Sequence, residues 1–208
     1  FMEQPRKEQQ PSLRAAVLVG GGSTRMGRPK AWLDHGHGPH ALHLVRLLQT
    51  LPDVEEVVLS GTLPPNAPEG IAEIPHCPDH VAGIGPVGAL LGLFAEQPDS
   101  AWLIVGCDLV LLEAGLLKWL CRERSPTHPA TVPVSPDGRH ETVLAIYEPS
   151  VRPLLERMLR DGRKSLQRQF PNWSIHAPQV PDALAGQLVN VNTPEELSRV
   201  QTQLTSTY

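Results

Sequence analysis

The chain has 208 residues, of which 40% are hydrophobic and 19% charged, and its 18 basic and 22 acidic side chains give a net charge of −4. This composition is typical of a globular protein, and the acidic balance argues against a duplex nucleic-acid binder, because such proteins carry basic faces. No apolar run is long enough for a membrane span, and three cysteines without C-x-x-C spacing favour a soluble, cytoplasmic protein with reduced thiols.

The N-terminal residues 1–13 are polar and lack periodicity, so we expect a mobile tail followed by a single domain over residues 14–208. Short apolar runs then alternate with helix-like segments. Strands are expected at 15–19, 56–60 and 101–105, with a further candidate at 71–74, and helices at 39–51, 87–95 and 113–122. Continuous apolar strands separated by helices predict an α/β fold with a doubly wound, mostly parallel, Rossmann-like sheet.

The pattern changes after residue 125. Strand-like runs at 130–135 and 141–149 flank a Pro-Asp-Gly turn, which predicts a small antiparallel hairpin. A helix is expected at 150–160, followed by the segments 164–170 and 174–176. Thr193, Pro194 and Glu196 form a capping box that predicts a last helix.

The stretch VLVGGGSTRMGRPK, residues 17–30, places three glycines between an apolar strand and a basic segment. It does not fit a Walker A loop, because Arg28 and Pro29 follow Gly27, and Arg25 stands where a Rossmann fingerprint needs its third glycine. A flexible connection is one alternative. The other is a phosphate-binding loop, in which glycines let backbone N–H groups approach a nucleotide while Arg25, Arg28 and Lys30 neutralise phosphate charge.

These residues also resemble the L-A-G-G-x-S-x-R-M-G-x-x-K motif of the molybdenum cofactor guanylyltransferase family, with Val19 in place of the usual alanine. Three further stretches resemble that family in the same order: DHVAGIGPVGALLG at 79–92, WLIVGCDLVLL at 102–112 and LVNVNTPEEL at 188–197. Together they span residues 15–204, nearly the whole chain.

The resemblance implies transfer of GMP from GTP to the molybdopterin cofactor, with release of pyrophosphate and with Mg²⁺ held by Asp108. A carboxylate after a buried strand is costly unless a cation pairs it, which agrees with that role, although an Asp there could also cap the next helix. The residues implied to be catalytic are Arg25, Lys30 and Asp108. Those implied to bind the nucleotide are Leu18, Val19, Gly20, Gly21, Ser23, Arg25, Lys30, Ser60, Asp79, Gly85 and Asp108.

The resemblance assigns Asn190 and Asn192 to the acceptor side of the cleft; alternatively they organise the turn before the capping box. Ser60 stands where relatives often carry an asparagine that contacts the nucleotide. Transient contacts with proteins that deliver or accept the cofactor are also implied, and no nucleic-acid or membrane partner is expected.

Gly20 favours GTP, because relatives that use CTP tend to carry alanine at that position. A cytidylyltransferase or a sugar-phosphate nucleotidyltransferase is the enzymatic alternative, and a nucleotide-binding protein without turnover is the alternative from another class. Two histidine groups, His35/His37/His40/His43 and His76/Cys77/His80, could suggest metal sites. We expect neither to be one, because the first is interrupted by glycines and the second lacks a fourth ligand.

Overall fold

The computed structural model describes residues 10–20, 29–34, 38–64 and 66–189. Within these ranges the strands are β1 (Leu13–Leu18), β2 (Val54–Ser60), β3 (His76–Cys77), β4 (Ala101–Gly106), β5 (Ala130–Thr131) and β6 (Leu144–Tyr147). The α-helices are α1 (His40–Gln49), α2 (Pro86–Glu96), α3 (Ala114–Glu123), α4 (Arg152–Arg160), α5 (Leu166–Gln169) and α6 (Asp182–Ala185). Short 3₁₀ helices occur at Lys30–Trp32, Ile71–Glu73, Pro149–Val151, Phe170–Asn172 and Gly186–Leu188.

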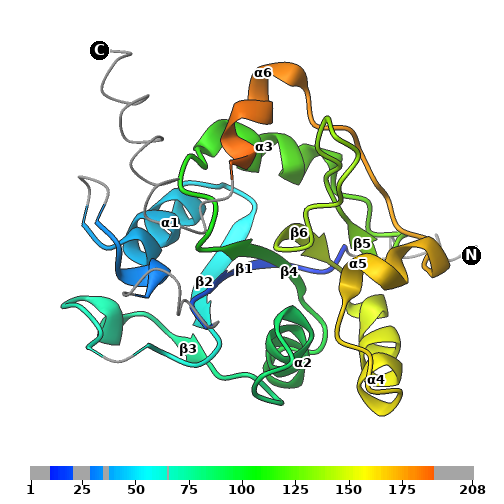
Figure 1. The fold of residues 1–208 in the computed structure, drawn as a ribbon, viewed down its shortest axis with the longest axis horizontal. Coiled ribbons are helices and arrows are strands. Elements are labelled where there is room, and N and C mark those ends of the chain that lie inside the picture. The colour runs from blue at the N-terminus through cyan, green and yellow to red at the C-terminus, as the bar shows by residue number, and fades with distance from the viewer. Residues whose placement is uncertain (1–9, 21–28, 35–37, 65, 190–208) are drawn as a thin grey trace, which may run out of the picture.

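One mixed sheet runs through the molecule in the order β3-β2-β1-β4-β6-β5 (Figure 1). The neighbouring pairs from β3 to β4 are parallel, whereas β6 is antiparallel to both β4 and β5. The central strand β1 lies between β2 and β4. The strands β2 and β3 extend the sheet from one edge of β1, and β4, β6 and β5 extend it from the other. Open α/β sheets bind ligands at such a switch point, beyond the carboxyl ends of the strands.

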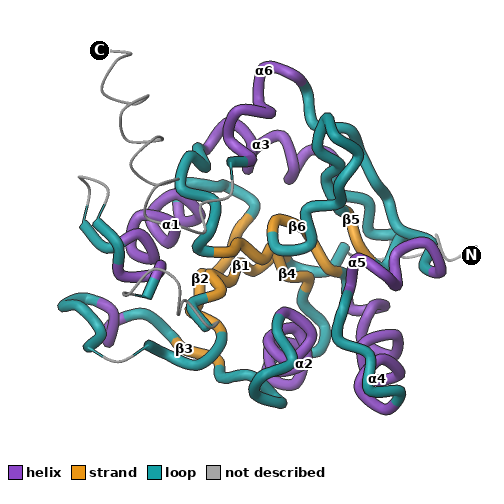
Figure 2. Tube along the Cα trace, viewed as in Figure 1, coloured by secondary structure: helices purple, strands orange, loops and turns teal. Residues whose placement is uncertain are grey.

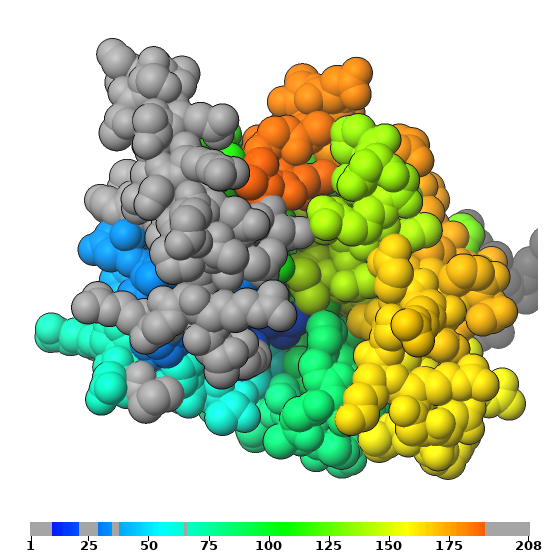
Figure 3. Space-filling model, in the orientation of Figure 1, coloured from blue at the N-terminus to red at the C-terminus, as the bar shows by residue number. Residues whose placement is uncertain are grey.

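Helices cover both faces of the sheet (Figures 1 and 2). The apolar positions of α1 and α3 pack on one face, and those of α2 and α4 pack on the other. Helix α4 lies beside α2, as the yellow and green atoms in Figure 3 show. Every residue of β4 is buried, as expected for a strand covered on both faces. The predicted α/β fold with a mostly parallel sheet is therefore confirmed.

The antiparallel hairpin is also confirmed, although its paired strands are shorter than the apolar runs. Its turn closes with a hydrogen bond from the Ser135 N–H to the Arg139 carbonyl at 2.9 Å, and Gly138 has a φ of +83°. Helix α4 matches the prediction after a 3₁₀ turn. The strand considered at 71–74 is wrong, because residues Ile71–Glu73 form a 3₁₀ turn that follows Gly70 in the left-handed region. The last predicted helix lies outside the described residues.

The N-terminal boundary differs from the expected tail. Residues 1–9 lie outside the described part, but Leu13 is buried within β1. Arg124 donates to the Pro11 carbonyl at 2.8 Å, and the Ala101 N–H donates to the Ser12 carbonyl at 2.8 Å. Residues 11–13 are therefore part of the folded chain. Among the described helices, none has the length and apolar character needed to cross a bilayer.

Candidate functional site

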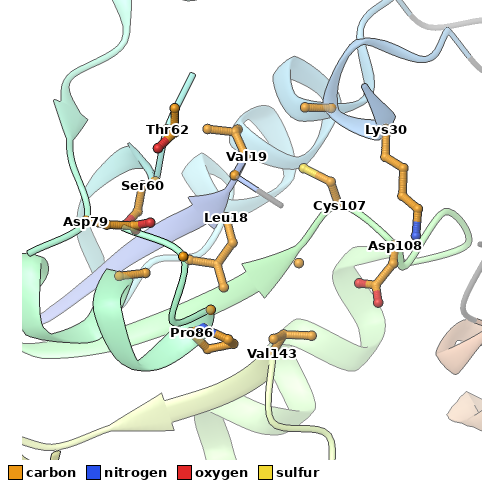
Figure 4. A pocket seen from close by; sticks show the side chains of 17 residues that line it. Leu18, Val19, Lys30, Ser60, Thr62, Asp79, Pro86, Cys107, Asp108 and Val143 are labelled. Carbon is orange, nitrogen blue, oxygen red and sulfur yellow. The ribbon is translucent and has the colours of Figure 1, made fainter. Parts of the chain in front are cut away.

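A cleft of about 490 Å³ opens at the carboxyl ends of β1, β2 and β4 (Figure 4). This volume lies in the range of small-molecule and cofactor sites. Eight residues expected at the site line it: Leu18, Val19, Gly20, Lys30, Ser60, Asp79, Gly85 and Asp108. The predicted Gly21, Ser23, Arg25, Asn190 and Asn192 lie outside the described residues.

One wall of the cleft is formed by the loops after β1 and β2, whose backbones pack directly against each other. A Cβ atom on Gly20 would lie 3.0 Å from the Thr62 nitrogen, and one on Gly61 would lie 3.0 Å from the Gly20 nitrogen. Gly61 also has a φ of +108°, which side chains rarely allow. The loops that follow β1 and β2 can therefore approach this closely only because both positions are glycine.

Ser60 presents a buried hydroxyl at this end of the cleft. Its side chain has no exposed surface, and its Oγ has no hydrogen-bond partner among the described residues. Ser60 is paired in register with Leu18, so both side chains project from the α2 side of the sheet. A buried polar atom left without a partner costs free energy. A ligand group that bonds this oxygen would remove that cost.

Asp79 is held in place by helix α2. A Cβ on Gly88 would lie 2.3 Å from the Val81 carbonyl oxygen, and the His80 N–H donates to the Gly88 carbonyl at 3.0 Å. Because Gly88 has no side chain, the loop that carries Asp79 can pack directly against the backbone of α2. Burial raises the pKa of the Asp79 carboxyl above its usual value, and the neighbouring His76 lowers it.

Gly85 forms the entrance to α2. It is the N-terminal cap with a φ of 65° and is followed by Pro86 at the first helical position. That order matches the conformational preferences of the two residues, because glycine tolerates positive φ and proline suits the helix start. The G-P turn thereby brings the beginning of α2 to the cleft wall.

The opposite end of the cleft carries Lys30, Cys107 and Asp108 (Figure 4). Lys30 begins a 3₁₀ turn, and Asp108 follows β4. Burial, and to a smaller extent the Asp108 carboxylate, raises the pKa of the Cys107 thiol to about 12, while Lys30 acts to lower it. Both charged groups therefore act on the same buried thiol. The cleft has a cation and a carboxylate at one end and Ser60 and Asp79 at the other.

The carboxylate of Asp108 lies over Gly106. A Cβ there would be 2.7 Å from Asp108 Oδ1 and 2.9 Å from Val143 Cγ2. The Gly106 N–H donates to the Val143 carbonyl at 2.8 Å. Val143, which directly precedes the antiparallel strand β6, thus lines the cleft next to Gly106 and Asp108.

Several lining residues were not predicted from the sequence, among them Thr62, Ala89, Cys107 and Val143. Cys107 and Thr62 are near neighbours of Asp108 and Ser60, so their positions at strand ends were the available signal. Val143 could not be predicted, because its side chain is an ordinary apolar one. It is brought to the cleft only by the pairing of β6 with β4.

The histidine groups do not assemble into a metal site within the described ranges. No group of three or more His, Cys, Asp or Glu side chains there is arranged to hold a metal ion. His40 is buried at the start of α1, and His76 Nε2 lies 2.6 Å from the Gly61 carbonyl oxygen. His35 and His37 lie outside the described residues.

Comparison with known proteins gives consistent matches over most of the chain. The family described as MobA-like NTP transferase domain matches residues 15–174. The chain is 28% identical over 195 residues to a probable molybdenum cofactor guanylyltransferase of Bacillus mycoides, covering 91% of this chain and 96% of that protein. A protein of the same name from Carboxydothermus hydrogenoformans is 29% identical over 194 residues, covering 91% and 95%.

Solved structures share the fold. Molybdopterin-guanine dinucleotide biosynthesis protein A from Archaeoglobus fulgidus superposes with a TM-score of 0.74 at 19% identity, covering 93% of this chain and 99% of that one. The 2-C-methyl-D-erythritol 4-phosphate cytidylyltransferase of Thermus thermophilus superposes with a TM-score of 0.63 at 16% identity, covering 91% and 98%.

Proposed function

Because the chain belongs to the family of MobA-like NTP transferase domains, we propose that it transfers GMP from GTP to the molybdopterin cofactor, forming the guanine dinucleotide and pyrophosphate. The enzyme is a nucleotidyltransferase. The choice of guanine and of the acceptor rests on the names of its relatives, which are called probable molybdenum cofactor guanylyltransferases, and on Gly20 in the first loop.

The polarity of the cleft is the observation that carries this proposal (Figure 4). Ser60 and Asp79 lie at one end, and Lys30 and Asp108 at the other. We assign the first end to the nucleoside, whose hydroxyl and ring N–H groups would pair with the buried Ser60 hydroxyl and the Asp79 carboxylate. We assign the second end to the phosphates, where the Lys30 ammonium would neutralise negative charge.

Asp108 is the residue we propose to hold Mg²⁺. Its carboxylate lies against Gly106, where a Cβ would be 2.7 Å from Oδ1, and the residue lines the cleft. Mg²⁺ is usually bound by one or two carboxylates together with substrate phosphates. The single carboxylate therefore fits that ion. When bound, the ion would supply positive charge to the phosphate oxygens.

In the proposed reaction an oxygen of the acceptor phosphate attacks the α-phosphorus of GTP. A new phosphorus–oxygen bond forms as the bond to the β-phosphate oxygen breaks, and the electron pair leaves with pyrophosphate. Lys30, together with Arg25, would stabilise the charge that develops on the leaving group. The protein's part is mainly positioning and charge neutralisation, which are large contributions to phosphoryl-type transfers.

We place Asn190 and Asn192 at the acceptor, or at the metal, as the family motif implies. Transient contacts with proteins that deliver or accept the cofactor would follow from such an acceptor. We propose a cytoplasmic location, where GTP is supplied and cysteines stay reduced.

The experiment that tests the proposal is a melting-temperature series with GTP, CTP, ATP and UTP, each with and without Mg²⁺. Saturation at about 100 times Kd adds roughly 2.7 kcal/mol to the unfolding free energy, which is on the order of 5–10 °C for a domain of this size. We expect a shift with GTP and Mg²⁺ that Asp108→Asn reduces. Asp99→Asn, an exposed carboxylate outside the cleft, is the matched control.

Turnover is then measured as pyrophosphate release with GTP and molybdopterin cofactor. Asp108→Asn should abolish it with the fold intact, whereas Asp99→Asn should leave it unchanged. A shift and turnover with CTP instead would replace the guanylyl assignment by a cytidylyl one. Nucleotide binding without pyrophosphate release would favour a binding protein.

A further inference from the structure

His76 is an exposed residue of the edge strand β3. Its Nε2 lies 2.6 Å from the carbonyl oxygen of Gly61. Since a carbonyl only accepts, Nε2 carries a proton and donates it. The Gly61 N–H donates in turn to the Cys77 carbonyl at 3.1 Å. Two adjacent residues of β3 therefore hold both polar groups of Gly61.

This arrangement fixes the orientation of the next peptide. The Gly61–Thr62 peptide is trans, so its carbonyl oxygen and the Thr62 N–H point to opposite sides. With the oxygen held by His76, the N–H lies on the side of Gly20, whose Cβ position is 3.0 Å from the Thr62 nitrogen. Thr62 lines the cleft, and its N–H has no hydrogen-bond acceptor in the part of the chain that the structure describes.

His76 also acts on Asp79, because its presence lowers the pKa of that carboxyl against the effect of burial. Asp79 Oδ1 lies 3.6 Å from the Cβ position of Gly61. Figure 4 shows Ser60, Thr62 and Asp79 together at one end of the cleft, remote from Lys30 and Asp108. One side chain is thus linked to both a backbone donor and a carboxylate at that end.

We propose that His76 is a positioning residue for the nucleoside half of the nucleotide substrate, which it serves by holding the Gly61 carbonyl so that the Thr62 N–H is oriented toward the nucleoside. The role rests on the proposed function, because it needs a nucleotide in the cleft. The phosphates and the reacting α-phosphorus lie at the other end, so His76 affects nucleotide affinity and leaves the chemical step unchanged.

The test compares His76→Val with His76→Gln. Valine suits an edge strand but removes the donor, whereas the glutamine amide nitrogen reaches about as far as Nε2. His80→Val is the control, because His80 is an exposed neighbour whose side chain has no hydrogen-bond partner among the described residues. For each protein we would measure Kd for GTP and for pyrophosphate with Mg²⁺, the melting temperature, KM for GTP and kcat.

We expect His76→Val to weaken GTP binding and raise KM by roughly fivefold to tenfold, the effect of about one hydrogen bond. Pyrophosphate binding and kcat should stay within twofold, His76→Gln should recover most of the affinity, and His80→Val should match the wild type. Equal losses for GTP and pyrophosphate, or a loss that glutamine does not recover, would show a merely structural strand contact and overturn the proposal. Wild-type protein that fails to bind GTP would overturn the proposed function, whereas GTP binding that His76→Val leaves intact would overturn the role of His76 alone.

Discussion

A Cβ atom on Gly92 would lie 2.3 Å from the carbonyl oxygen of Pro78, so the second turn of α2 and the chain just before Asp79 are in direct backbone contact. Alanine at this position raises helix propensity by about 1 kcal/mol, but the loop must move to admit the methyl group. We expect Gly92→Ala to lower GTP affinity by tenfold or more because Asp79 is displaced, with a net loss of stability of about 1 kcal/mol from overpacking. Titration calorimetry with GTP and thermal unfolding would measure both effects.

The control is Gly115→Ala in α3, where the nearest atoms to a new Cβ are the Leu184 and Gln187 side chains at 3.6 and 3.8 Å. That change should be neutral or stabilising by up to about 1 kcal/mol and leave GTP binding alone. Unchanged GTP affinity in Gly92→Ala would show that the loop tolerates displacement without losing the nucleotide.

Arg124 and Glu148 form the best-shielded ion pair among the described residues, with side chains 9% and 1% exposed. Two hydrogen bonds of 2.7 and 2.9 Å join the guanidinium to the carboxylate. Glu148→Gln leaves the arginine charge buried without its counter-ion, which costs about 3–5 kcal/mol. Thermal unfolding should show a fall on the order of 10 °C.

The comparison variant is Glu156→Gln, which breaks the exposed pair with Arg152 on α4 at 43% and 45% exposure. Exposed helix pairs contribute less than about 0.5 kcal/mol. If both variants unfold at the same temperature, the shielding of the Arg124 pair has no energetic effect.

The raised pKa of Asp79 predicts how the stability of the folded protein depends on pH. The carboxyl binds its proton more tightly in the folded chain than in the unfolded one, so its ionisation opposes folding as pH rises through the unfolded value of 3.8 and the higher folded value. Asp79→Asn should therefore become more stable than the wild type as pH rises through this window, and keep that advantage at neutral pH. Denaturant unfolding at a series of pH values checks it. A difference that is flat with pH would contradict the raised pKa.

Burial raises the pKa of all three thiols, to about 12 for Cys77 and Cys107 and about 11 for Cys121. Because the thiolate is the reactive form, labelling by a disulfide reagent at pH 8 should be slow in the folded protein and rapid after unfolding. Bound GTP should slow the labelling of Cys107 further, because this residue lines the cleft. Rapid labelling of Cys107 in the folded state would show that the packing around this buried thiol opens transiently.

Apolar patterning was sufficient to predict the central strands and the longer helices. The buried strands are continuous apolar runs, α1, α3 and α4 carry one apolar face each, and α2 is a long apolar segment that is buried nearly all round. The patterning failed at 71–74, where two isoleucines between a left-handed glycine and a proline resemble a short strand but form a turn. β3 was missed because two residues carry no period, and it exists only through its pairing with β2.

Residues of the site that follow a strand were predictable, since Ser60 and Asp108 stand at strand ends and Asp79 precedes the G-P turn. The hydrogen bond from His76 to the Gly61 carbonyl was not predictable, because it depends on which loop lies beside β3 in the folded chain. The contact between Gly20 and Gly61 was likewise hidden, since the two residues are 41 positions apart and neither loop alone requires it.

The mutual contact between Gly20 and Gly61 has an evolutionary consequence. A side chain at either position would strike the other loop's backbone, and no change at the second position could make room, because glycine is already the smallest residue. Relatives that keep this loop spacing should therefore keep both glycines, whereas relatives with alanine at the position of Gly20 should hold the two loops farther apart. At the close spacing the pair would behave as a single inherited unit within the cleft.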